Sequence, residues 1–181
     1  MQTVNLYQTL YHQCQENIQF AEQLKQLSLE QLSWRKSPES WNILECLEHL
    51  NLYGDYYLPA IEQAIRQSKS KAELMVKPGL LGAYFAKSML PKEKLNKMKT
   101  FKDKNPLNSK LGTEAIDKFI EQQNILLTLL KQSENVSLNK VKIKISISKL
   151  IKLRLGDTFQ FYCNHILRHL KQIEAVRDSW G

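Results

Sequence analysis

The chain has 181 residues, of which 43% are hydrophobic and 24% are charged, and its formal net charge is +8 at neutral pH. This length predicts one domain over residues 1–181, with a core of ordinary size. No run approaches the roughly 20 consecutive apolar residues that a transmembrane helix requires, and we expect no secretory signal, because the first residues lack a basic region followed by an apolar one.

The positive charge gathers in two lysine-rich segments, residues 87–110 and 140–154, each with a net charge of +6, so that the rest of the chain carries −4. Solvated loops are the preferred interpretation, although such segments can also favour anionic ligands or an acidic membrane surface. Neither segment interleaves aromatic residues with its lysines, so no specific nucleic-acid partner is predicted.

The chain contains three cysteines, Cys14, Cys46 and Cys163, which is an odd number, and no two of them form a C-x-x-C pair. Neither a disulfide framework nor a cysteine-rich zinc site is expected from this pattern. The pattern predicts reduced thiols and a cytoplasmic protein.

In chain order, the first predicted helix covers residues 3–27, where apolar side chains recur every three or four positions. A turn signal follows at residues 37–40. The second helix is predicted to open at Asn42, with Glu45 three residues later as the other member of a capping box, and to run to about Arg66.

Residues 67–111 are interrupted by prolines, and a connection of this length predicts a crossover between the second and third helices. Within it, the apolar residues 80–86 can form a short helix that covers the bundle, or a contact for a partner. The third helix is predicted over residues 113–132.

Residues 140–148 alternate apolar and polar side chains, which predicts either a strand without an obvious partner or the edge of a loop. Asp157 and Gln160 then form the pattern of a second capping box, which opens a fourth helix that runs to about Asp178. The predicted fold class is therefore all-α, a four-helix bundle.

The fourth helix places His165 and His169 four residues apart, so both side chains leave the same face. Two imidazoles in this arrangement can share a divalent ion such as zinc, nickel, copper or iron. His49 of the second helix can be a third ligand if the two helices pack together. Three protein ligands leave a position for water or substrate, as catalytic metal sites do. Two hydrogen-bonded histidines without a metal would show the same spacing, and this alternative stays open.

Four further residues share the faces of these histidines and are candidates for orienting an imidazole or contacting a substrate: Glu45, Tyr53, Tyr56 and Gln172. Glu45 can also act as a general base on metal-bound water. Its capping role competes for the same carboxylate, and the capping role is preferred.

Residues 41–50, WNILECLEHL, resemble the signature W-[SN]-x-x-E-x-x-x-H-L of the DinB-like superfamily. Residues 155–157, LGD, followed by residues 165–173, HILRHLKQI, resemble its closing pattern G-[DE]…H-x-x-R-H-x-x-Q-I. The two motifs stand in the family's order. This superfamily includes YfiT-type metal-dependent hydrolases and bacillithiol S-transferases.

The resemblance implies an up-down-down-up bundle whose crossover joins the second and third helices. It also implies that His49, His165 and His169 bind nickel or zinc, and that the protein forms a homodimer. The basic, isoleucine-rich stretch before the last helix is less typical of the family.

The expected function is that of a metal-dependent enzyme that transfers a low-molecular-weight thiol to a small electrophilic substrate. The preference for thiol transfer rests on family analogy. The first alternative is a hydrolase of the YfiT type. The second is a non-enzymatic, metal-binding or stress-associated module that meets a partner through residues 80–86 and the lysine-rich segments.

Overall fold

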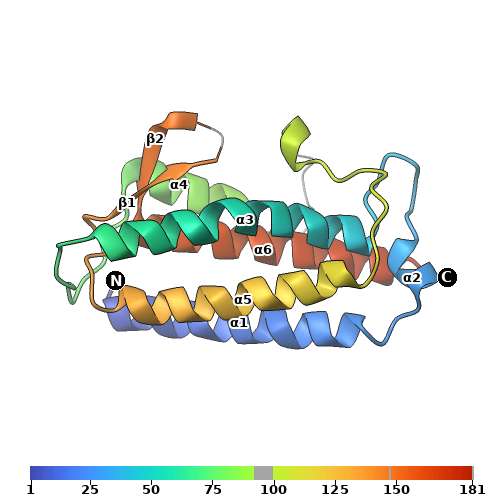
Figure 1. Cartoon of the computed structure of the whole chain (residues 1–181), viewed down its shortest axis with the longest axis horizontal. Helices are drawn as coiled ribbons and strands as arrows, with labels where there is room; N and C mark the ends of the chain where they lie inside the picture. The colour runs from blue at the N-terminus through green and yellow to red at the C-terminus, as the bar shows by residue number, and fades with distance from the viewer. Residues whose placement is uncertain (92–99, 147, 181) are drawn as a thin grey trace.

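The computed structural model describes residues 1–91, 100–146 and 148–180, and this part of the chain is mostly helical. It contains six α-helices, one 3-10 helix and two strands: α1 (Thr3–Leu24), α2 (Leu29–Ser33), α3 (Ile43–Gln67), α4 (Leu80–Met89), η1 (Lys102–Lys104), α5 (Glu114–Ser133), β1 (Lys142–Ile145), β2 (Ser148–Arg154) and α6 (Leu155–Arg177). The four long helices α1, α3, α5 and α6 lie alongside one another (Figure 1).

Each long helix packs against two of the others, because α5 and α6 both contact α1 and both contact α3. In Figure 1, α1 and α6 run toward the end that holds α2 and the C-terminus, whereas α3 and α5 run toward the β1–β2 hairpin. The apolar stripes of the four helices meet in a common core. Its largest fully buried side chains include Tyr57, Phe119, Phe159 and Tyr162.

α3 begins where the sequence predicts. The Asn42 side chain accepts a hydrogen bond from the Glu45 amide at 2.8 Å, and the Glu45 carboxylate accepts one from the Asn42 amide at 3.0 Å. The predicted capping box is therefore confirmed, and it fixes the first turn of the helix that carries His49. The helix continues through Pro59 to Gln67.

The second predicted capping box is wrong. α6 begins at Leu155, directly after β2, and Arg154 at its N-cap makes no side-chain capping bond. Asp157 is 2% exposed and accepts a hydrogen bond from the Gly79 amide at 3.0 Å. α4 also lies close above it, since a Cβ on Gly82 would fall 2.2 Å from the Asp157 carboxyl carbon. Asp157 therefore links α4 to α6 and does not cap α6.

The strand predicted without a partner has one, because β1 pairs antiparallel with β2. Lys142 lies opposite Arg154 and Lys144 opposite Lys152, and the register is interrupted after Lys144. The all-α prediction is corrected to a mostly helical fold with a small two-stranded sheet. β2 escaped prediction because the sequence SKLIKLR lacks regular alternation of apolar and polar residues.

The long connection between α3 and α5 contains α4, so residues 80–86 form a helix, which packs against α6 and β2. Part of the lysine-rich segment 87–110 lies outside the described residues, since residues 92–99 are not among them. Among the helices of the described ranges, none is both long and apolar enough to cross a membrane.

Candidate metal centre

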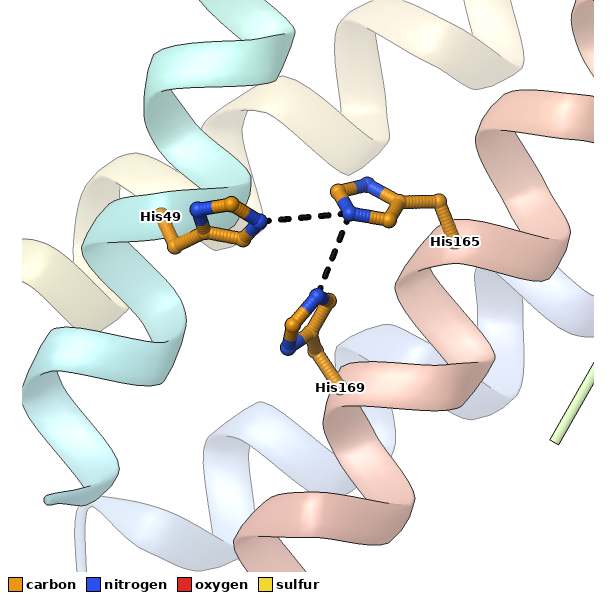
Figure 2. Close-up of side chains that lie close together, drawn as sticks. All are labelled: His49, His165 and His169. Carbon is orange, nitrogen blue, oxygen red and sulfur yellow. Dashed lines mark hydrogen bonds between the residues drawn. The ribbon is translucent and has the colours of Figure 1, made fainter. Parts of the chain in front are cut away.

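Three histidines from two helices meet between α3 and α6. His49 lies in the second turn of α3, and His165 and His169 lie on successive turns of α6. Figure 2 shows the three rings pointing toward one another. Nε2 of His165 is 3.2 Å from Nε2 of His49 and 3.1 Å from Nε2 of His169. The four-residue spacing aligns the α6 pair, and the packing of α3 on α6 brings the third ring to it.

The three rings are buried, with exposed fractions of 3% for His49, 5% for His165 and 9% for His169. Burial lowers the pKa of His49 to about 4 and the pKa of His169 to about 3, because a charged ring would lose its hydration. The pKa of His165 is lowered by burial and then by its two histidine neighbours. All three are therefore neutral near pH 7, which is the form of imidazole that binds metals.

The outer nitrogens of two rings have oxygen partners. Nδ1 of His49 lies 2.6 Å from the backbone carbonyl oxygen of Lys104, and Nδ1 of His169 lies 3.0 Å from Oε1 of Gln172. Because these oxygens accept hydrogen bonds, each Nδ1 carries the ring proton and each Nε2 presents a lone pair. Gln172, a candidate from the sequence, thus contacts an imidazole.

Protons alone cannot satisfy the inner nitrogens. Nε2 of His165 has at most one proton to donate, whereas both His49 and His169 present lone pairs to it. A divalent ion would accept all three lone pairs. With Zn–N bonds of about 2.0–2.1 Å, tetrahedral ligands stand about 3.3 Å apart, close to the 3.1 and 3.2 Å observed between the nitrogens. The donor set therefore fits a divalent metal ion.

Aromatic rings border the histidines. The ring centroid of Trp41 lies 4.7 Å from that of His49, and the centroids of Tyr53 and Phe161 lie 4.5 and 6.2 Å from that of His165. Such a wall lowers the local dielectric and suits the apolar part of a small ligand. Trp41 is absent from the candidates named from sequence. Its position at the start of the WNILECLEHL motif is the sequence feature that could have identified it as a site residue.

The last residue of η1, Lys104, and the residue after it, Asn105, hold the His49 side of the site in place. The Lys104 carbonyl faces His49, and the Lys104 ammonium donates to the Leu52 carbonyl at 3.0 Å. Asn105 accepts a hydrogen bond from Nε1 of Trp41 at 3.0 Å. These two residues therefore orient both an imidazole and its aromatic neighbour. The sequence does not predict the Lys104 contact to His49, because a backbone carbonyl carries no residue-specific signal.

The Glu45 carboxylate has a structural role. Its side chain is fully buried, and its Oε1 accepts hydrogen bonds from the Arg35 guanidinium at 3.0 Å and from the Asn108 amide at 2.6 Å. Its other oxygen accepts the capping bond from Asn42. With both oxygens engaged, the carboxylate has no evident capacity for a general base, and the capping role preferred from the sequence is the one observed.

The two tyrosine candidates lie differently. The Tyr53 ring packs on the rings of His165 and His49, and only 7% of the residue is exposed. The Tyr56 hydroxyl donates to the carbonyls of Lys144 and Ile145 in β1, at 3.3 Å in each case. Tyr53 therefore belongs to the wall of the histidine site, and Tyr56 holds the hairpin on α3.

Comparison with known proteins gives one positive finding. The family model described as the DinB superfamily matches residues 10–173, a range that includes all three histidines. No curated protein and no solved structure matches the chain.

Proposed function

Since this chain belongs to the DinB superfamily, we propose that it is a metal-dependent enzyme that transfers a low-molecular-weight thiol to a small electrophile. His49, His165 and His169 would hold one zinc or nickel ion. The convergence of their neutral Nε2 atoms at 3.1 and 3.2 Å carries this proposal. Three protein ligands leave a coordination position open. A divalent ion in that site would supply the charge that keeps a thiol in its nucleophilic thiolate form.

The protein's own groups would orient the ligands and exclude water. The Lys104 carbonyl and the Gln172 amide oxygen hold two rings in the tautomer that directs Nε2 inward. Trp41 and Tyr53 place apolar surface beside the rings of His49 and His165. These walls would receive the carbon skeleton of the electrophile and keep bulk water from the thiolate.

Thiol transfer is preferred to hydrolysis because of the position of Glu45. Attack by water gains from a general base within hydrogen-bond reach, and the Glu45 oxygens are engaged by Arg35, Asn42 and Asn108. In the described ranges, the cluster of potential ligands consists of the three histidines and includes no carboxylate. A thiol whose pKa is lowered by the ion would release its proton to solvent, so its thiolate would need no base in the site.

We also propose the family's architecture for the whole chain: one domain over residues 1–181, an up-down-down-up four-helix bundle and a homodimer. The directions of the long helices in Figure 1 support the bundle topology, and α3 and α5, which run the same way, need the long crossover between them. The core cluster that the four long helices share among the described residues supports one domain. The dimer rests on the family resemblance, and light scattering of the purified protein tests it.

The test of the enzyme begins with elemental analysis of the purified protein, for which we expect about one zinc or nickel ion per chain. Conjugation of a chromogenic haloarene is then followed with cysteine, glutathione, coenzyme A and bacillithiol as thiols. We expect conjugation with at least one thiol, its loss after chelation and its return when metal is restored. His169→Ala should abolish it, and His12→Ala should not, because the His12 side chain is 72% exposed and pairs with Glu16.

The outcomes separate the parts of the proposal. Conjugation that is indifferent to chelation and to His169→Ala would contradict a role for the metal. A protein that retains metal but conjugates none of the four thiols would contradict the transfer reaction and leave the metal site standing. Hydrolysis of activated esters that depends on metal would favour the YfiT-type alternative.

A further inference from the structure

The most exposed large apolar side chains of the described residues gather near the β1–β2 hairpin. Leu74 precedes α4 and is 90% exposed, Leu80 begins α4 and is 95% exposed, and Leu150 of β2 is 94% exposed. Leu81 and Tyr84 of α4 are 56% and 69% exposed. Scattered exposed leucines are ordinary, but five such residues at one end of a molecule indicate a contact surface.

These residues lie on connected elements. α4 contacts β2, and Leu74 lines a surface cavity of about 620 Å³ together with Lys77, Lys140 and Arg154, the last residue of β2. Figure 1 places the hairpin, the start of α4 and the N-terminus at the same end of the molecule. We call this region the hairpin-end surface. Its apolar residues are Leu74, Leu80, Leu81, Tyr84 and Leu150, and its lysines are Lys77, Lys140, Lys142, Lys144 and Lys152.

Three lysines of the hairpin, Lys142, Lys144 and Lys152, are exposed. Lys144 pairs with Lys152 in the strand register, and both are exposed, whereas the adjacent pair of Ile143 and Leu153 is buried. Lys142 is exposed on the same face as Lys144, two residues away. The hairpin therefore presents Lys142, Lys144 and Lys152 to solvent, together with Leu150, and buries Ile143 and Leu153.

Little negative charge offsets these cations. Residues 140–154 contain five lysines, one arginine and no acidic residue. Asp157, which follows, is 2% exposed beneath α4. Glu73 lines the same cavity and offsets part of this charge, since hydrogen bonds from Ser137 and Asn139, and then the cations of Lys140 and Lys77, lower its pKa. The hairpin-end surface is thus both apolar and strongly cationic.

We propose that the hairpin-end surface docks the protein on an anionic lipid bilayer. Exposed leucines and a tyrosine can enter the interface between headgroups and acyl chains, while lysines around them pair with lipid phosphates. If a second copy of this chain docked here, residues 140–154 of the two copies, each with a net charge of +6, would face and repel one another. A nucleic acid would neutralise the lysines and leave the leucines in water. The bilayer accounts for both features.

Docking would not involve the residues of the histidine site. His49 lies near the start of α3, whereas the hairpin is held by Tyr56 and Tyr57 in the second half of that helix. The surface and the metal centre therefore use different residues. Failure of one proposal would leave the other intact.

The contribution of the lysines to vesicle binding is tested by sedimentation of the full chain with vesicles of phosphatidylcholine alone or mixed with phosphatidylglycerol. We expect binding to the anionic vesicles, none to the neutral ones, and weakening as salt is raised. A lysine beside an anionic leaflet contributes roughly fivefold, so the triple variant Lys142→Ser, Lys144→Ser and Lys152→Ser should bind on the order of a hundredfold more weakly. The matched triple variant of lysines outside this surface, at positions 36, 102 and 110, should bind almost as the wild type does.

The contribution of the exposed leucines is tested by Leu80→Gln and Leu150→Gln, each of which should weaken vesicle binding roughly tenfold. Leu29→Gln is the control, because Leu29 also begins a helix, is 56% exposed and lies at the other end of the molecule. Circular dichroism verifies that each variant is folded. Equal binding by all variants, or tighter binding to duplex DNA or polyglutamate than to the anionic vesicles at the same ionic strength, would overturn the proposal.

Discussion

Two regions of the molecule carry opposite exceptions to the rule that apolar groups lie inside and polar groups outside. Beside the start of α3, three histidines are buried and face one another. At the hairpin end, leucines stand in water beside lysines. A buried polar group is tolerable only with partners, whereas an exposed apolar one adds little to the cost of folding and marks a place of contact. Stability should therefore depend on the first region, and association on the second.

The largest expected effect is the stabilisation of the histidine region by metal. An ion present at a thousand times its Kd adds about 4.1 kcal/mol to the free energy of unfolding. Urea unfolding of chelated protein, with and without zinc or nickel, should show a shift of this order. His165→Ala should lose the shift, because that ring contacts both of the others, and His12→Ala should keep it. A full shift in His165→Ala would mean that the ion binds elsewhere.

A second contrast comes from two leucines. Leu47 of α3 is fully buried in the core, and Leu150 of β2 is 94% exposed. Leu47→Ala should lower the free energy of unfolding by about 2–5 kcal/mol, through lost burial and the cavity left behind. Leu150→Ala should change it by no more than about 0.5 kcal/mol. Chemical denaturation of both variants measures the difference, and similar losses would show that the hairpin end is packed in solution.

The histidine region should also make the metal-free protein sensitive to acid. The pKa of His49 is lowered to about 4 in the folded protein, whereas an unfolded histidine titrates near about 6.5. Between these values the unfolded chain binds a proton that the folded one does not, so stability falls as the pH drops from about 6.5 to 4.

Urea midpoints of the chelated protein at several pH values across this range measure the decline. His49→Gln should reduce its slope, since one source of the proton difference is gone. His12→Gln, at an exposed position, is the control and should leave the slope unchanged. Equal slopes in wild type and His49→Gln would contradict the burial of a neutral ring.

The histidine pair was predictable from sequence because it depends on one turn of one helix. The four-residue spacing of His165 and His169 fixes their common face wherever the helix packs. His49 could join them only if α3 met α6, and spacing alone left a metal-free pair as an alternative. The family resemblance supported His49 as the third ligand, and the structure brings its ring to the pair.

The contacts that eluded prediction join residues far apart in the chain. His49 and the Lys104 carbonyl are separated by 55 positions, and Gly79 and Asp157 by 78. No periodicity reports such a pairing, and a backbone acceptor has no sequence signature at all. The partner strand β2 was missed for a related reason, since a strand without alternation is recognised only through its neighbour.

Gln172 offers a finer test of the histidine region. Its side-chain oxygen lies 3.0 Å from Nδ1 of His169, where it fixes the tautomer and the ring orientation. Gln172→Leu should weaken metal binding by about 10–100-fold, as loss of a partner behind a ligand does. Competition with a chromogenic chelator measures this. Gln160→Leu, on the same helix, is the matched control, because Gln160 donates to the Gly156 carbonyl and not to an imidazole.

The smallest effect separates the two capping patterns that look alike in the sequence. Asn42→Ala removes the acceptor for the Glu45 amide and should cost about 1 kcal/mol of unfolding free energy. Gln160→Ala should cost no more than about 0.5 kcal/mol, because α6 begins at Leu155 without a side-chain cap and Asp157 is held by Gly79. Denaturation of both variants makes the comparison. Equal losses would mean that α6 is capped as its sequence suggests, and that the Asp157 contact to α4 opens in solution, which would loosen the hairpin end as well.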